Sequence, residues 1–307
     1  MLRSAMLAVS RNKTVKKAVV GFGPTRRVVD RFVAGEALDD CVAAVRRLVD
    51  DGLLATVDHL GEDTTNEAEA TATADSYLEL LARLDAAGLA SSCEVSVKLT
   101  ALGLALPGGR ELAAHNAGRI CAAARAVGTT VTVDAEDHTV IDATLEIADG
   151  LRETYPETGT VLQAYLHRTP ADCRRYASEG VRIRLCKGAY DEPASVALRS
   201  HDTVDAAYLE CLRILFKGES YPMVASHDPR MIEAALAYAD VAGRAPDTFE
   251  LQMLFGIRTD EQARLAALGH RMRVYVPYGV DWYGYFTRRL AERPANLLFF
   301  GRALVGR

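Results

Sequence analysis

The side chains with the clearest capacity for chemistry gather near the end of this chain. Tyr285, Arg288, Arg289 and Glu292 recur at helical spacing (i, i+3, i+4, i+7), so they share one face of a helix. Arginine carries a rigid fork of donors that matches a carboxylate, so this face can clamp a small carboxylic acid if it points into a pocket. The spacing alone leaves a second interpretation open, an exposed helix with an Arg288–Glu292 ion pair.

The residues just before this face predict how it is positioned. A short apolar run from Arg273 to Val276 is followed by Pro277 and Gly279. After Gly284 the chain contains neither glycine nor proline until Pro294. This order predicts a buried strand, a turn and then a helix.

Seven further apolar runs precede that strand, and Ala-, Leu- and Glu-rich stretches separate them. The eight expected strands are Leu53–Leu60, Glu94–Leu99, Thr129–Asp134, Thr160–Leu166, Val181–Cys186, Met223–Ser226, Phe249–Leu254 and Arg273–Val276. The expected helices include Glu67–Ala87, Arg110–Val127, Thr139–Tyr155, Asp202–Phe216, Pro229–Val241 and Asp260–Leu268. Eight strand–helix units predict an α/β fold of the (β/α)8 TIM barrel type, which the regularity favours over a doubly wound open sheet.

A barrel of this type places its chemistry at the carboxyl ends of the strands. Polar groups end nearly every expected strand: Asp58 and Glu62, Lys98, Asp134 and Glu136, Gln163, Arg184 and Lys187, His227 and Asp228, Gln252, and Tyr275. Lys98 and Arg184 stand between apolar neighbours, so we expect them to be semi-buried and therefore paired or functional. A purely structural salt bridge between Lys98 and Asp134 is the alternative.

Composition sets broad limits on function. The chain has 307 residues, of which 49% are hydrophobic and 25% charged, as in ordinary globular proteins. Its net charge of -5 argues against nucleic acid as a partner. The six cysteines are scattered and form no metal-like cluster with the seven histidines, so we expect no metal site and a reducing compartment.

The first part of the chain differs from the rest. Residues 1–50 predict an N-terminal helical extension, and residues 51–307 the catalytic barrel. No apolar run approaches the roughly 18 residues that span a bilayer. The extension holds a basic cluster of Arg11, Lys13, Lys16, Lys17, Arg26 and Arg27. A solvated helix face and contact with an anionic membrane surface both remain open for it.

Seven motifs in collinear order carry a resemblance to a known family. They are Ser96-Val97-Lys98-Leu99-Thr100, Val133-Asp134-Ala135-Glu136, Leu162-Gln163-Ala164-Tyr165, Arg184 to Tyr190, Ser226-His227-Asp228, Phe249 to Leu254, and Tyr275 through Glu292. Together they resemble the flavin-dependent proline dehydrogenases, and the length is similar to that of the monofunctional bacterial members. The similarity covers the chain from about Leu53 to Glu292.

The resemblance implies a distorted barrel with its last helix over the mouth. It also implies oxidation of L-proline to Δ1-pyrroline-5-carboxylate by hydride transfer to FAD, with electrons passed to a membrane quinone. The expected enzyme is cytoplasmic, and contact with the inner face of the cell membrane is one interpretation of its basic extension.

Roles for individual residues follow from the same resemblance. The catalytic groups would be Lys98, Asp134 and Arg184. The substrate would be bound by Arg288, Arg289, Tyr275, Tyr285, Tyr190, Leu254, Glu292 and Glu62, with Glu62 pairing across the mouth with Arg288. The flavin would be held by Gln163, Arg184, Lys187, Gly188, Ser226 and His227.

Two other functions compete with this interpretation. A strand-borne lysine such as Lys98 or Lys187 can serve as the nucleophile of a cofactor-free Schiff-base aldolase. An aldolase lysine needs a neutral form, whereas a neighbouring Asp134 would stabilise the charged form of Lys98. A non-catalytic barrel that only binds a ligand is the other alternative.

Overall fold

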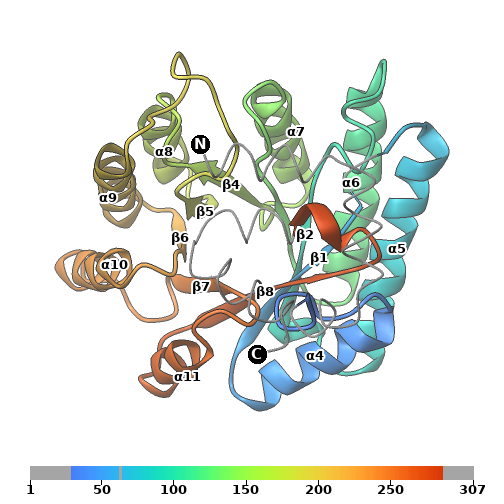
Figure 1. Ribbon diagram of the computed structural model, residues 1–307, viewed down its shortest axis with the longest axis horizontal. Helices are drawn as coiled ribbons and strands as arrows, with labels where there is room; N and C mark the ends of the chain where they lie inside the picture. Colours follow the sequence, from blue (N-terminus) through green and yellow to red (C-terminus); the bar gives the residue numbers. More distant parts are fainter. Residues whose placement is uncertain (1–28, 62–63, 286–307) are drawn as a thin grey trace, which may run out of the picture.

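Eight parallel strands form a closed barrel in the computed structural model, which describes residues 29–61 and 64–285 (Figure 1). Each strand pairs with the next along the chain, and the last pairs with the first through Leu54 to His59 beside Arg273 to Tyr278. The strands are β1 (Leu54–His59), β2 (Cys93–Val97), β3 (Val131–Val133), β4 (Gly159–Gln163), β5 (Arg182–Cys186), β6 (Tyr221–Ala225), β7 (Glu250–Leu254) and β8 (Met272–Tyr278). The predicted (β/α)8 barrel is confirmed.

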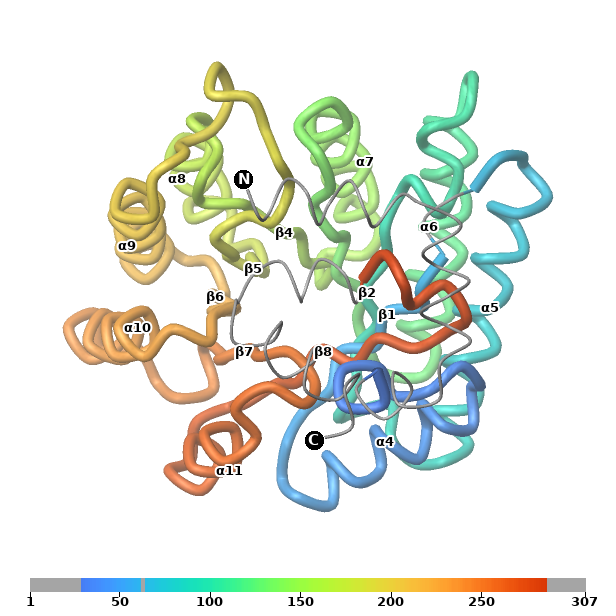
Figure 2. Tube along the Cα trace, viewed as in Figure 1, coloured from blue at the N-terminus to red at the C-terminus, as the bar shows by residue number. Residues whose placement is uncertain are grey.

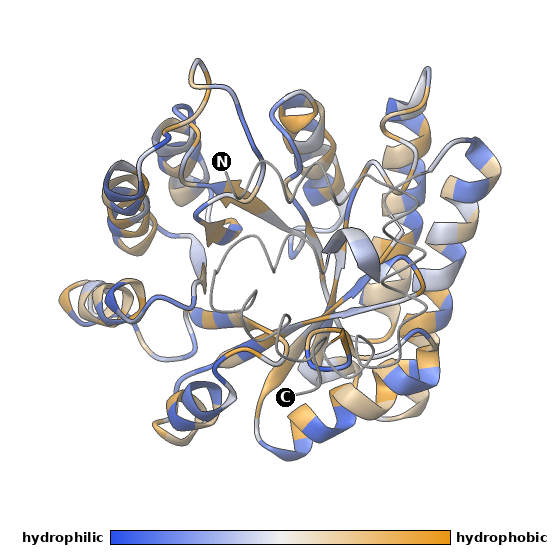
Figure 3. Ribbon diagram, in the orientation of Figure 1, coloured by the Kyte–Doolittle hydropathy of each residue, from blue (hydrophilic) through white to orange (hydrophobic). Residues whose placement is uncertain are grey.

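Helices form a ring outside the strands, as the trace in Figure 2 shows. They are α4 (Leu38–Asp50), α5 (Glu67–Ala86), α6 (Gly109–Ala126), α7 (Ile141–Thr154), α8 (Thr169–Ser178), α9 (His201–Lys217), α10 (Pro229–Val241) and α11 (Thr259–Ala267), with a short 3-10 turn η1 (Ala90–Ser92). The outer helices carry both hydrophilic and hydrophobic residues (Figure 3). Their apolar residues and the outward-facing residues of the strands make up the main hydrophobic core.

Several helices begin at residues suited to cap them. Asn66 accepts a hydrogen bond from the Glu69 amide at the start of α5, and Ser200 does the same for Thr203 at the start of α9. Asp228 caps α10 and is followed by Pro229, whose fixed φ suits the first helical position. These signals explain why the expected helix limits agree with the structure to within one or two residues in most cases.

Most observed strand limits differ from the predicted ones by one to three residues, and the ends of β4 and β8 have an evident structural reason. Strand β4 ends at Gln163 rather than Leu166, because the chain turns there and Leu166 instead bridges Ala197 in antiparallel fashion. Strand β8 continues through Pro277 to Tyr278. Pro277 lies beyond Tyr275, the last residue of β8 that pairs with β7, so its missing N–H interrupts no ladder on that side.

The interior of the barrel is unusually polar. Such barrels are commonly filled by branched aliphatic side chains. Here several strands carry charged or polar residues at alternate positions, and nearly all of these are buried, as in Glu94-Val95-Ser96-Val97-Lys98 and Glu250-Leu251-Gln252. Buried charges are stable only when they are paired and hydrogen-bonded, so this interior must be a connected ionic network.

Residues 29–36, which we call the strap, lie at the mouth of the barrel. The Ala34 amide donates to the Pro277 carbonyl, and the Gly279 amide donates to the Gly35 carbonyl, so the strap is bonded to the end of β8. A second hydrophobic cluster forms there from Val29, Phe32, Val33, Leu60, Trp282, Tyr283 and Tyr285, with Ile257 and Tyr275 against it. The strap thus joins the first described residues to the last ones.

Among the described residues, no helix is both long and apolar enough to cross a membrane. The basic cluster between Arg11 and Arg27 lies outside the described residues. Helix α4 packs against β1, β8 and α5. The division into an extension of residues 1–50 and a barrel of residues 51–307 therefore remains a prediction.

Candidate functional site

An ion pair between strands lies at the centre of the candidate site. One nitrogen of Arg184 on β5 is 2.7 Å from Asp134 Oδ1, just beyond β3. Ser96 Oγ on β2 lies within 2.8 Å of the same nitrogen and 2.7 Å of the same carboxylate oxygen. Arg184 is 4% exposed and Asp134 7% exposed, so the pair is shielded from bulk water. Both charges belong to the residues predicted to be catalytic.

The rest of the Arg184 guanidinium is also bound. Its Nε donates to Gln252 Oε1 at 2.7 Å, and its other terminal nitrogen lies 3.1 Å from Glu94 Oε1. Burial alone would lower the pKa of Arg184, but the charges of Asp134 and Glu94 outweigh it and raise the pKa. A guanidinium held on every edge in this way has a fixed position and a permanent charge.

Lys98 reaches the same centre from the end of β2 and is 9% exposed. Its Nζ lies 2.6 Å from Asp58 Oδ2 on β1 and 3.8 Å from Asp134 Oδ2. The predicted Lys98–Asp134 proximity is therefore present, but the nearer partner is Asp58. Asp58 is one of the polar residues that the sequence places at the strand ends. It lies on β1, which pairs with β2, and its contact with Lys98 assigns it to the site.

Tyr275 on β8 completes the cluster from the opposite side. Its hydroxyl donates to Asp134 Oδ2 at 2.7 Å, and the Arg184 guanidinium lies over its ring, 5.3 Å from the centroid. Burial, followed by the charges of Asp134 and Asp58, raises the pKa of Tyr275 well above its ordinary value. Tyr275 is consequently a neutral hydrogen-bond donor. Leu254 of β7 is its direct neighbour in the sheet register.

A second group of polar residues lines the mouth at the ends of β4 to β7. Gln163 donates to the Glu136 carbonyl at 2.8 Å, which fixes its amide and leaves the amide oxygen available. Lys187 pairs with Asp205 and, at 3.1 Å, with Asp228. Lys187 is half-buried, whereas Lys98, Asp134 and Arg184 are buried.

His227 and Ser226 follow strand β6. The Leu254 amide donates to His227 Nε2 at 2.9 Å, which makes that nitrogen the acceptor and leaves Nδ1 as the N–H of a neutral imidazole. Ser226 Oγ accepts from the Asp228 amide. Arg258, which the sequence did not single out, donates to the His227 carbonyl at 2.6 Å. Its left-handed backbone (φ 55) is a conformation that non-glycine residues adopt mainly where surrounding contacts impose it.

Gly188 is required by a neighbouring ring. Its φ is +113, and a Cβ there would lie 2.2 Å from the Tyr165 ring, so no other residue fits without displacing Tyr165. Tyr165 belongs to a small hydrophobic cluster with Leu166 and Ala197. The predicted contact of Gly188 with the cofactor remains a prediction beside this structural reason.

The segment from Asp191 to Ser200, which follows β5, is bonded to the neighbouring loops. Glu192 is buried and accepts hydrogen bonds from the backbone and the ring of His138. The Leu198 amide donates to the Tyr165 carbonyl, and Ala197 bridges Leu166. These contacts hold the segment against the ends of β3 and β4.

The remaining predicted substrate residues are only partly described. Tyr285 is buried in the hydrophobic cluster at the mouth, in a helical turn that begins at Trp282, and Tyr190 is half-buried after β5. Arg288, Arg289, Glu292 and Glu62 lie outside the described residues. Within residues 29–61 and 64–285, no group of three or more His, Cys, Asp or Glu side chains is arranged to hold a metal ion.

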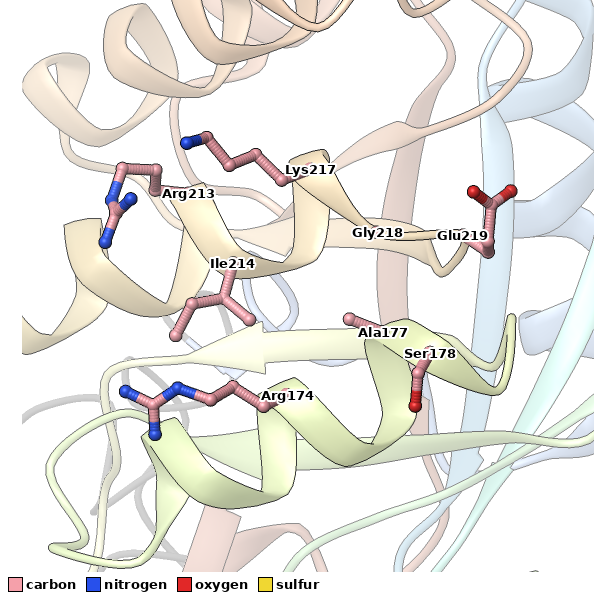
Figure 4. Close-up of a pocket in the computed structure, with 8 residues that line it drawn as sticks. All are labelled: Arg174, Ala177, Ser178, Arg213, Ile214, Lys217, Gly218 and Glu219. Atoms are coloured by element: carbon pink, nitrogen blue, oxygen red, sulfur yellow. The ribbon is translucent and has the colours of Figure 1, made fainter.

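A surface pocket between α8 and α9 lies away from this centre (Figure 4). Arg174, Ala177 and Ser178 line it from α8, and Arg213, Ile214 and Lys217 from α9. Ser178 and Lys217 are the last residues of their helices, which lead into the amino ends of the next strands. In this fold that end of the barrel contributes to stability rather than to chemistry, so the pocket is not a second candidate site.

The sequence of this chain is similar to those of known proteins over nearly its full length. A sequence model of the family described as Proline dehydrogenase matches residues 41–302. Proline dehydrogenase 1 of Bacillus subtilis (strain 168) is 39% identical over 305 residues, which cover 99% of each chain. Proline dehydrogenase of Deinococcus radiodurans is 39% identical over 308 residues, covering 99% of this chain and 98% of the relative.

Solved structures give the same fold. The chain is similar to proline utilization A (PutA) from Bdellovibrio bacteriovorus inactivated by N-propargylglycine, with a TM-score of 0.80 and 26% identity. The alignment covers 87% of this chain but 33% of that longer protein. The similarity to PutA therefore concerns about a third of PutA.

Proposed function

Because this chain belongs to the proline dehydrogenase family, we propose that it oxidises L-proline to Δ1-pyrroline-5-carboxylate, with FAD as hydride acceptor and a membrane quinone as electron acceptor. The observation that carries the proposal is the buried cluster of Lys98, Asp134, Arg184 and Tyr275. It lies inside a barrel whose sequence aligns end to end with single-function proline dehydrogenases.

The reaction places definite demands on this cluster. A hydride leaves the ring carbon beside nitrogen, the nitrogen loses a proton, and a carbon–nitrogen double bond forms. The amine must therefore be neutral before reaction, and a nearby fixed cation favours the neutral form. Lys98 is such a cation, and Asp58 and Asp134 hold it in place. Because the site is nearly dry, its charges act more strongly than they would in water.

The polar groups at the mouth fit a flavin dinucleotide. An anionic cofactor with a polar ring system needs cations beside amide, hydroxyl or imidazole groups that donate or accept hydrogen bonds. The ends of β4, β5 and β6 supply these groups from Gln163, Lys187, Ser226 and His227. Gly188, beside Lys187, adds no side chain that would keep a ligand away from the backbone. We propose that these residues and Arg184 hold FAD, which would accept the hydride when bound.

The substrate would lie between this donor set and the helix that follows β8. Tyr275, Leu254, Tyr190 and Tyr285 would pack around the pyrrolidine ring. Arg288 and Arg289 would bind its carboxylate, Glu292 would orient an arginine, and Glu62 would close the mouth by pairing with Arg288. Replacing either arginine by methionine should weaken binding of a ring carboxylate about 10- to 150-fold, the loss of one charge-assisted bond. Neutral cyclic amines should bind unchanged, and unaltered carboxylate affinity in both variants would remove the clamp.

Delivery of electrons to a quinone requires access to the membrane. We propose a cytoplasmic enzyme whose basic cluster between Arg11 and Arg27 contacts the anionic inner face of the cell membrane. Vesicle flotation with anionic and with neutral lipids would test this contact. Equal binding to both vesicle types would contradict the electrostatic role.

The function itself is tested by one spectrum. The purified protein should show flavin absorbance that bleaches when L-proline is added without oxygen and recovers when a soluble quinone is added. N-propargylglycine, which inactivates the Bdellovibrio protein, should abolish bleaching, and L-proline should protect against it. Protein without flavin absorbance after reconstitution with FAD, or flavin that proline does not bleach, would contradict the proposal.

The Schiff-base aldolase is not favoured by the site. Lys98 forms ion pairs with Asp58 and Asp134, and Lys187 forms ion pairs with Asp205 and Asp228. A lysine that forms a Schiff base instead needs its amine free to attack a carbonyl. Borohydride treatment in the presence of a carbonyl substrate should therefore leave no adduct on either lysine.

A further inference from the structure

The charges inside the barrel form a balanced set. Among the described residues, the ion-paired network inside the barrel contains four carboxylates and four cations: Asp58, Glu94, Asp134 and Glu250 with Lys98, Arg182, Arg184 and Arg273. Asp134 and Lys98 face the mouth, whereas Glu94, Arg182, Glu250 and Arg273 lie nearer the start of their strands. Arg184 contacts both groups, because it binds Asp134 on one edge and Glu94 on the other.

Glu94 is the anion beneath Arg184. Its two oxygens contact Arg184 at 3.1 Å and Arg182 at 2.6 Å, and Thr56 Oγ1 donates to it at 2.8 Å. Burial would raise the pKa of Glu94, but Arg273, Arg182 and Arg184 lower it to about 2. Glu94 is therefore ionised throughout the neutral range and carries a fixed negative charge.

Arg182 carries the charge opposite to that of Glu94, and both residues lie near the start of their strands. Its side chain is 20% exposed, lies over the Tyr221 ring and donates to Glu94. Within the described part of the chain it forms no ion pair with Asp134. Removing its charge thus alters the field at Arg184 without removing a group from the mouth. Glu94 and Arg182 form an opposed pair whose effects on Arg184 have opposite sign.

We propose that Glu94 and Arg182 are positioning residues that act through Arg184 to set how readily the bound flavin is reduced. This inference rests on the proposed function, in which Arg184 lies beside the flavin. Reduction adds negative charge to the cofactor, so a surplus of positive charge in the dry network favours the reduced form, and a deficit disfavours it. The described part of this network is neutral in the native chain, which places the native flavin between these limits.

The test is a reductive titration of the flavin-loaded protein against a reference dye, without proline. Glu94→Gln removes a negative charge and should raise the ratio of reduced to oxidised flavin at a fixed potential about tenfold, which is about 30 mV for a two-electron couple. Arg182→Met keeps the aliphatic stem and should lower the ratio by a similar factor. The double variant restores neutrality and should return the ratio to within about threefold of the native value.

Asp149→Asn is the matched control. Its carboxylate also pairs with two arginines, Arg152 and Arg175, but on the outside of the barrel between α7 and α8. This variant should leave the ratio unchanged. Shifts of the same sign in Glu94→Gln and Arg182→Met, or no shift in either, would overturn the proposal. If Glu94→Gln does not fold, Arg182→Met decides alone, and an unchanged or raised ratio in it overturns the proposal.

Failure of this inference is distinguishable from failure of the proposed function. A native protein that binds no flavin, or whose flavin proline does not bleach, contradicts the function. A native protein that is bleached by proline, but whose flavin does not respond to the two charges in opposite directions, contradicts the inference alone.

Discussion

The Lys98 ammonium nitrogen lies 2.6 Å from Asp58 Oδ2, which joins the ends of β2 and β1 inside the barrel mouth. Asp58 is almost completely buried, and its remaining surroundings include the Tyr77 hydroxyl. A lysine with this partner keeps one orientation toward the centre of the site. In the proposed reaction, this pair fixes the position of the positive charge beside the substrate amine.

Asp58→Asn should lower the rate of flavin reduction by proline at least tenfold while leaving flavin bound. It removes one partner of a buried ion pair, so it should also lower the free energy of unfolding by about 3–5 kcal/mol. Tyr77→Phe is the control, because it changes the surroundings of Asp58 without changing a charge. Stopped-flow absorbance would measure the rate, and an equal loss in both variants would mean that packing rather than charge is responsible.

Tyr275→Phe deletes the hydroxyl that donates to Asp134 but keeps the ring over Arg184. We expect a moderate loss of proline turnover, with ring packing retained. Tyr275→Ser removes the ring as well, so it should narrow the preference for proline over 4-hydroxyproline by weakening proline turnover more. The ratio of kcat/KM for the two substrates measures this effect, and an unchanged ratio in Tyr275→Ser would place Tyr275 outside the ring pocket.

The ion pairs of Asp228 predict how the free energy of unfolding depends on pH. Burial would raise the pKa of Asp228, but Arg230 and Lys187 lower it from 3.8 to about 2. A carboxyl with a depressed folded pKa stabilises the fold above its unfolded pKa, and this contribution is lost as pH falls through the folded pKa. Asparagine retains the helix cap, so Asp228→Asn should lower the free energy of unfolding by only about 1–2 kcal/mol at pH 7. The difference in free energy of unfolding between the native protein and Asp228→Asn should shrink as pH falls from about 4 to 2.

Urea unfolding of both proteins across this pH range would measure the difference. A constant difference at all pH values would show that the Asp228 charge does not contribute.

Gly256→Ala tests the strap. The φ of Gly256 is +71, and a Cβ there would lie 1.7 Å from the Arg31 carbonyl oxygen. We expect the strap to be displaced, the free energy of unfolding to fall by about 1–3 kcal/mol and KM for proline to rise. Gly243→Ala is a matched control, since Gly243 has a φ of +64 and nothing within 4 Å of the added Cβ. Equal effects in the two variants would assign the loss to backbone strain instead.

Much of the barrel could be predicted because its strands alternate clearly with helices. Apolar neighbours in the sequence also predicted that the charges of Lys98 and Arg184 are semi-buried, and the structure buries both more fully. Which anion each cation meets could not be predicted, because that depends on the stagger between neighbouring strands. Thus Lys98 lies closer to Asp58 than to Asp134, and Arg184 binds Asp134.

Contacts between segments far apart in the chain carried no signal in the sequence. The Arg31 side chain donates a hydrogen bond to the Gly256 carbonyl at 3.3 Å, although 225 positions separate the two residues in the chain. Glu192 and His138 are also hydrogen-bonded to each other, and each of them lies in a loop without regular secondary structure. Arg258 was missed because an arginine with a left-handed backbone looks like any other arginine in a sequence.

We propose that the buried charges at the barrel mouth carry out proline oxidation, and Lys98→Met tests this role most directly. The variant keeps the aliphatic stem and removes the cation that we propose lies beside the substrate amine. Anaerobic stopped-flow absorbance should show flavin still bound but reduced by proline about 100-fold or more slowly. Titration with tetrahydrofuran-2-carboxylate should give an affinity within about threefold of the native protein, because that ligand carries no amine. Flavin reduction at the native rate in this variant would contradict the account.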